Sequence, residues 1–259
     1  MSINEMMDGL LWLKTLSVAL ARVLPIVILV PFFSSRELKG LLRYGVAFAL
    51  CMFISPSIYS DEALREVAST HLFFLLAKEL VLGIVTGALM AMPFWLFDSV
   101  GALFDNQRGA LIGGQFNPLL SDVSSPLSHM LQQCAIIVLI QVVGVNVLLD
   151  TIWMSYTIWP PLGWNPAFST DMNELWLANI STTFTKMIMY AAPLIVVMLF
   201  IEFAMALLGL YSPQMQVFVL SIPVKCLVGV AMLTIYLSVL FRFMEQDIEY
   251  FGDLLRFFV

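Results

Sequence analysis

Residues 72–104 read LFFLLAKELVLGIVTGALMAMPFWLFDSVGALF, a long run that is almost entirely apolar. Only Lys78, Glu79 and Asp98 bring charge into it. Crossing the hydrocarbon core of a bilayer takes about 20 apolar residues in a helix that rises about 1.5 Å per residue. Because this run is longer than one perpendicular crossing, we expect its helix to tilt, to break near Pro93 or to project beyond the membrane.

The composition of the whole chain also indicates a membrane protein. The 259 residues are 61% hydrophobic and 12% charged, and the mean hydropathy is +0.94. Soluble domains are about 45–50% apolar and about 25% charged, and a soluble globule of this size could not bury so many apolar side chains. The net charge of −6 disfavours nucleic acid, whose phosphates attract clustered Lys and Arg. We therefore expect contact with membrane lipid and no nucleic acid partner.

Apolar segments recur along the chain and predict an all-α membrane protein with about six long helices. The segments cover about 10–33, 41–59, 72–104, 130–159, 184–211 and 217–243. Prolines within or beside them, which kink helices, are Pro25, Pro56, Pro93, Pro193 and Pro223. A polar linker at 161–183 is predicted to separate an N-terminal helical part, 1–160, from a C-terminal helical hairpin and tail, 184–259.

Four charged residues inside these segments are candidate functional groups: Lys78, Glu79, Asp98 and Glu202. A charge that faces lipid costs at least about 2.5 kcal/mol, so each is expected to face protein or water. One hypothesis is that they pair across helices within an assembly. The alternative is that they bind a small solute or a proton in a stand-alone multipass secondary transporter.

No motif in the sequence predicts catalysis, a metal or a cofactor. The two histidines, His71 and His129, lack a second ligand at metal-binding spacing, and no HExxH or GxSxG pattern occurs. Gly109 and Gly114 have the spacing of a phosphate-binding loop, but Gln115 follows where that loop needs lysine. We therefore expect a protein that is not an enzyme.

The stretch FDNQRGALIGGQFNPLLSDVSSP, residues 104–126, is polar and glycine-rich between two apolar segments. Its glycines permit unusual backbone angles and close approach, and Asn117-Pro118 favours a turn. Loops longer than about 12–15 residues are uncommon and are often lids or binding loops. The sequence therefore predicts either a connecting loop or a loop that can fill and vacate an opening.

A second stretch carries a family resemblance: GLYSPQMQVFVLSIPVK, residues 209–225. Together with Gln107-Arg108-Gly109, Asn117-Pro118 and SYTIWP at 155–160, it resembles the FliR/SpaR/YscT family. Members of that family are T-type inner-membrane components of the type III secretion export apparatus. The resemblance extends over about residues 9–258, and the short tail after Phe243 is similar to the virulence branch.

The resemblance implies a non-enzymatic, multi-pass subunit of an export gate in the bacterial inner membrane, which passes unfolded secreted proteins. Implied partners are the R-type and S-type subunits, which join the T-type subunit in a cone-like helical array around a pore, and the U-type switch protein. The loop 105–126 would plug the closed pore through Arg108, Gly109, Gly113, Gly114, Phe116, Asn117 and Pro118. The implied subunit contacts are Pro213, Gln214, Phe218, Pro223 and Lys225.

Overall fold

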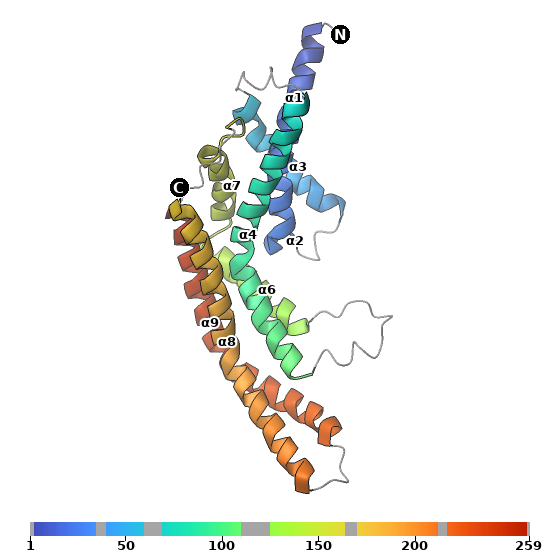
Figure 1. Cartoon of the computed structure of the whole chain (residues 1–259), viewed down its shortest axis with the longest axis vertical. Helices are drawn as coiled ribbons and strands as arrows, with labels where there is room; N and C mark the ends of the chain where they lie inside the picture. Colours follow the sequence, from blue (N-terminus) through green and yellow to red (C-terminus); the bar gives the residue numbers. More distant parts are fainter. Residues whose placement is uncertain are drawn as a thin grey trace. The chain divides into compact units, whose positions relative to one another are not determined.

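The computed structural model describes the chain as a set of helices (Figure 1). The described residues are 3–34, 40–59, 69–109, 125–163, 170–211 and 217–257. The helices are α1 (Ile3–Leu29), α2 (Pro31–Ser34), α3 (Leu41–Tyr59), α4 (Ser69–Gln107), α6 (Pro126–Val142), α7 (Asn146–Ile158), α8 (Thr170–Tyr211) and α9 (Val217–Phe257). No strand occurs in these ranges, which confirms the predicted all-α class.

Five of the helices are long and apolar enough to cross a membrane. A sixth crossing results if α6 and α7 are counted as one broken span, and about six helices were predicted. The helix α4 continues through Pro93, so a break at that residue, one of the three outcomes expected for this long run, does not occur. Part of the predicted linker 161–183 is helical, because α8 begins at Thr170.

The apolar segment 130–159 was expected to be one helix, and the structure divides it into α6 and α7. The break is centred on Gly144, whose φ of +86° lies in the left-handed region. The amides of Val143 and Gly144 both donate to the carbonyl of Leu139, which closes the last turn of α6. A glycine takes this helix-ending conformation without the steric cost of a Cβ.

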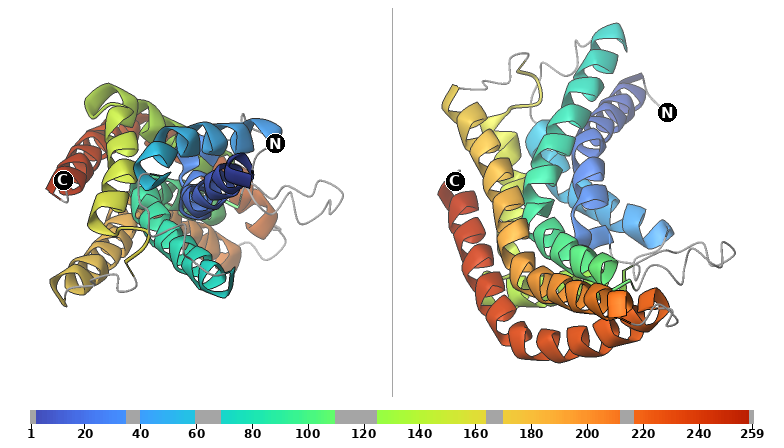
Figure 2. Two further views of the ribbon diagram at one scale, coloured as in Figure 1. Left: turned by 90° about the horizontal axis from the view of Figure 1, so that it is seen from above. Right: turned by 60° about the horizontal axis from the view of Figure 1, so that its bottom comes forward.

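The chain forms two compact units. The first comprises residues 1–92, 145–173 and 253–259, and the second comprises 93–144 and 174–252. In the first unit, α1 packs against α3 and lies beside the first half of α4 (Figure 2). Glycine permits the close approach of α1 and α4: a Cβ at Gly83 would overlap the backbone carbonyl of Arg22, and one at Gly87 would lie 2.9 Å from Ile26 Cα.

The second unit contains the C-terminal end of α4, the whole of α6 and most of the hairpin that α8 and α9 form. The two helices of this hairpin run side by side (Figure 1). Gly101 of α4 packs on the first turn of α6, where a Cβ would lie 2.6 Å from Ser128 Cα. The Tyr190 ring of α8 stacks on that of Phe243 of α9 and on that of Phe97 of α4. Asp247 accepts hydrogen bonds from Lys186 and Tyr190, which fixes the register of α9 on α8.

Candidate functional site

The two ends of the 105–126 stretch meet at one buried carboxylate, that of Asp105 in the last turn of α4. One oxygen of Asp105 accepts hydrogen bonds from the Ser125 hydroxyl and from the Leu127 amide, the latter at 2.9 Å. Ser125 is the N-cap of α6, and its own oxygen accepts from the Ser128 amide at 3.1 Å. Asp105 thus supplies a negative charge to the N-terminus of α6, where the helix dipole favours it.

The other oxygen of Asp105 holds Arg108, three residues further along the chain. The guanidinium of Arg108 lies 2.6 Å from Asp105 Oδ1 and above the ring of Phe104. A cation at a helix C-terminus is stabilised by the dipole. Gly109 follows with φ +78° and turns the chain away from the helix. A single carboxylate therefore stabilises the end of α4 and the start of α6.

A second polar contact joins the same two helices one level further from the loop. The Ser128 hydroxyl of α6 donates to Asp98 of α4. Asp98, Gly101 and Asp105 follow one another at spacings of three and four residues, which places them on one face of α4. The close contact at Gly101 and the two carboxylate contacts therefore join the end of α4 to the start of α6, and we call these residues the loop base.

The helix α9 contacts the loop base through small side chains. Cys226 donates a weak hydrogen bond to the carbonyl of Arg108 at 3.8 Å. A Cβ at Gly229 would lie 3.0 Å from the ring of Phe104, so the helix approaches the end of α4 closely. One residue before Cys226, Lys225 forms an ion pair with Glu202 of α8. The predicted residues Lys225, Arg108 and Gly109 therefore belong to one neighbourhood of the second unit.

Most of the remaining residues predicted for the plug and for the subunit contact fall in ranges that the structure does not describe. Gly113, Gly114, Phe116, Asn117, Pro118, Pro213 and Gln214 lie outside the described residues, as does the side chain of Phe218. Pro223 lies within α9. Their predicted roles stay predictions.

The first unit contains a separate polar cluster around Arg22, which is fully buried in α1. Its Nε lies 2.6 Å from the equally buried Glu79 carboxylate of α4. Its two terminal nitrogens donate to the carbonyls of Ser155 and Trp159 at 2.5 and 2.8 Å, and its Cζ lies 4.1 Å from the centre of the Tyr156 ring. Arg22 thus binds two carbonyls at the end of α7, of which that of Ser155 also accepts the Trp159 amide at 3.2 Å.

Lys78 extends the same arrangement to the turn after α7. Its ammonium donates to the carbonyls of Pro161 and Gly163 at 2.5 and 2.8 Å, and it lies 3.1 Å from Glu79. One carboxylate is therefore shared by two cations, which together bind four backbone carbonyls. The spacing of Glu79 and Gly83 on α4 brings Arg22 within reach, because Gly83 lets the α1 backbone approach closely.

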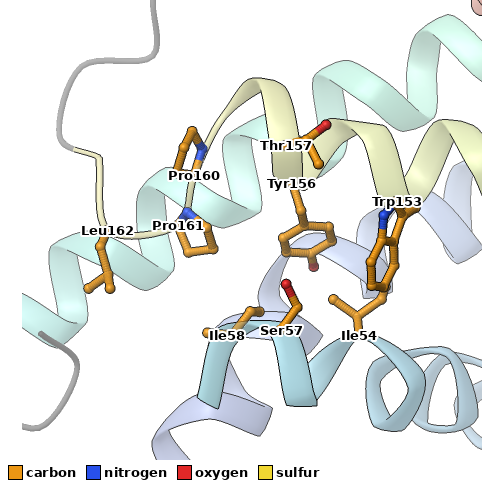
Figure 3. Close-up of a pocket in the computed structure, with 9 residues that line it drawn as sticks. All are labelled: Ile54, Ser57, Ile58, Trp153, Tyr156, Thr157, Pro160, Pro161 and Leu162. Carbon is orange, nitrogen blue, oxygen red and sulfur yellow. The ribbon is translucent and has the colours of Figure 1, made fainter. Parts of the chain in front are cut away.

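A cavity of about 170 Å³ lies beside this cluster (Figure 3). Its walls come from α3, α7 and the turn that follows α7: Ile54, Ser57, Ile58, Trp153, Tyr156, Thr157, Pro160, Pro161 and Leu162. The Tyr156 hydroxyl is engaged with the carbonyl of Ala19 at 3.0 Å. In the described part of the chain, no group of acidic, histidine or cysteine side chains is arranged to hold a metal ion.

Lys78 and Glu79 were among the site residues predicted from the sequence, whereas Asp105, Ser125 and Arg22 were not. Two signals in the sequence could have identified Asp105 and Ser125. Asp105 precedes Arg108 at a spacing of three, which is an ion-pair spacing on a helix. Ser125-Pro126 is a helix-start pattern. Arg22 carries no local signal of its partners, because Glu79 and the 155–159 carbonyls are distant in sequence.

Comparison with known proteins gives consistent matches. Residues 13–251 match the family described as bacterial export proteins, family 1. The chain is 32% identical over 225 residues, 86% of each chain, to "Yop proteins translocation protein T" of Yersinia pestis. It is 28% identical to SpaR of Salmonella typhimurium, over 84% of this chain and 81% of that one, and 26% identical to FliR of Escherichia coli, over 91% and 88%. These matches confirm the predicted family resemblance.

Proposed function

Because the chain belongs to the bacterial export proteins, family 1, we propose that it is a subunit of a type III protein-export gate, and that its 105–126 loop obstructs the pore at rest. Its relatives are named for translocation, secretion and flagellar biosynthesis. The five to six apolar helices in the described ranges make it a multi-pass membrane protein. The proposed location is the bacterial inner membrane.

The observation that carries the plug proposal is the set of contacts that Asp105 makes, two hydrogen bonds and one ion pair. A loop that blocks a pore must be held in place at its ends, because a loop that moves freely cannot seal the pore against ions. Asp105 joins Ser125 and Leu127 to Arg108, so both ends of the loop are held at one point. The glycines at 113 and 114 permit close packing in a narrow opening.

The exposed apolar surface of the hairpin supports assembly with other subunits. In the most apolar 18 residues of α8, and likewise in those of α9, only 17% of the residues are buried within the chain. Further membrane helices, and not lipid alone, are the proposed cover, because charged residues lie within these spans. The proposed partners are R-type and S-type subunits and the U-type switch protein, with unfolded secreted proteins as the substrate that passes through.

No specific observation favours the transporter alternative. Each of the four charges on which it depends is already engaged within its own unit: Glu79 with Lys78 and Arg22, Asp98 with Ser128, and Glu202 with Lys225. No motif for catalysis occurs in the sequence. The proposed role is therefore a structural one within an export channel.

The test is to replace residues 110–122 by a short Gly-Ser linker and to measure ion leak across the membrane of cells that express the whole apparatus. We expect a large increase in leak while native mass spectrometry still finds the chain in its hetero-oligomer. The matched control shortens the polar segment 60–68 in the same way, and no leak is expected. A tight membrane after loop shortening, with assembly intact, would contradict the plug.

A further inference from the structure

Glu202 is a half-exposed carboxylate on a helix that is long and apolar enough to cross a membrane. Its side chain is 45% exposed, whereas that of its ion-pair partner Lys225 is 10% exposed. Lys225 engages one carboxylate oxygen. Among the described residues, no hydrogen-bond donor engages the other oxygen.

The position of Glu202 along α8 lies inside the apolar part of the hairpin. Exposed apolar side chains occur along α8 from Leu177 to Tyr211. Between Ile188 and Tyr211, about 36 Å of helix and close to the hydrocarbon thickness of about 30 Å, Glu202 is the one charged residue. Before Ile188 the exposed residues include Ser181, Thr182 and Thr185 beside Leu177 and Phe184. Glu202 is about 14 Å from the Tyr211 end. An outward oxygen at that level needs a cover other than lipid tails.

The immediate surroundings of Glu202 favour a helix over water as that cover. Three exposed apolar residues share its face of α8. They are Leu199, three residues before Glu202, Phe203, which follows it, and Ala206, four residues after it. A water-filled path would be lined by polar groups, whereas the side chains around Glu202 are apolar. Ala206 is small, and small residues let two membrane helices approach closely.

The charge of the pair determines the chemistry of the partner. Lys225 already neutralises Glu202, so a second cation would leave an unbalanced positive charge in a medium of low dielectric constant. A neutral donor satisfies the free oxygen without that cost. We propose that the α8 face formed by Leu199, Glu202, Phe203 and Ala206 receives a membrane helix of another subunit, whose Ser, Thr, Asn or Gln side chain donates a hydrogen bond to Glu202.

The inference rests on the proposed function, since it requires an assembly with other membrane subunits. The test compares Ala206→Trp with Ala204→Trp in the co-expressed complex. Both alanines are exposed on α8, but they point about 200° apart because each residue turns the helix by about 100°. Neither change removes an ion-pair partner. The measurement is the fraction of the chain that native mass spectrometry finds in the hetero-oligomer.

We expect Ala206→Trp to lower that fraction about fivefold or more, because the partner helix cannot approach, and Ala204→Trp to leave it unchanged. Equal retention of both variants would overturn the docking face. If the wild-type chain is in no hetero-oligomer, the proposed function itself fails, so the two failures are distinguishable. A photo-crosslinker at position 203 identifies the neighbour, and crosslinks to phospholipid alone would also overturn the proposal.

With the neighbouring helix identified, the hydrogen bond is tested directly. Its Ser, Thr, Asn or Gln nearest the crosslink is replaced by Ala, in the wild-type chain and in the double variant Glu202→Met with Lys225→Met, which removes the acceptor and leaves no unpaired ammonium. We expect the replacement to weaken retention only when Glu202 is present, because the bond is already lost in the variant. Equal weakening in both backgrounds would contradict the proposed contact.

Discussion

Two ion pairs show how differently the two units complete their packing. Arg22 and Glu79 in the first unit are both fully buried, whereas Lys225 and Glu202 in the second are 10% and 45% exposed. The helices that carry them differ in the same direction: in their most apolar 18 residues, 56% of the residues of α1 are buried within the chain, against 17% of those of α8.

The two units find partners for their polar groups in different places. Arg22 has a carboxylate, two carbonyls and an aromatic ring within its own unit, so its charge is compensated before any assembly forms. The Glu202 pair has one contact and an open side. The first unit is therefore expected to fold by its own contacts, and the hairpin is expected to gain stability from neighbouring subunits.

The change that would break the first unit most severely is Gly83→Ala. The added Cβ would overlap the carbonyl of Arg22, a backbone atom that cannot move without displacing α1. We expect a loss of more than about 4 kcal/mol, which is exceptional for a single substitution. The measurement is the amount of folded chain recovered in detergent, followed by thermal unfolding.

The matched control is Gly45→Ala in α3, where a Cβ would meet nothing within 4 Å. Because glycine in a helix interior costs about 0.5–1 kcal/mol relative to alanine, this variant is expected to be as stable as the wild type or slightly more so. Similar losses in both variants would show that close packing at Gly83 is not the cause.

The next largest effect is expected for Glu79→Gln. Removing the carboxylate leaves Arg22 buried without its counter-charge, which costs about 3–5 kcal/mol. The double variant Arg22→Met with Glu79→Gln removes the stranded charge and is expected to recover part of the stability. Chemical denaturation in detergent measures both free energies of unfolding. A double variant no more stable than Glu79→Gln would contradict a stranded charge as the cause.

Sequence reasoning identified the helices and their charges better than it identified their partners. Apolar length alone predicted about six helices, because that signal is local. The break at Gly144 was missed, since a glycine in an apolar run does not reveal a positive φ. The contact between Arg22 and Glu79 depends on how α1 and α4 approach at Gly83, and no local pattern specifies that approach.

The candidate site was predicted only in outline, because local patterns in the sequence do not specify contacts between distant residues. The composition of 104–126 indicated a loop of interest, and Arg108 and Gly109 were among its predicted residues. The role of Asp105 was missed because it depends on Ser125 and Leu127, which lie about twenty residues further along the chain. Its usefulness as a cap for α6 becomes visible only when the two helix ends are brought together.

The smallest effect is expected for Lys225→Gln in the isolated chain, and it sharpens the comparison of the two ion pairs. The remaining carboxylate of Glu202 is 45% exposed and retains access to solvent or detergent headgroups. The substitution also removes a cation that was costly to bury. We therefore expect a loss of about 1 kcal/mol or less, measured by the same denaturation. A loss as large as that of Glu79→Gln would show that the hairpin pair is enclosed within the chain, and it would remove the distinction between a self-contained unit and one completed by its neighbours.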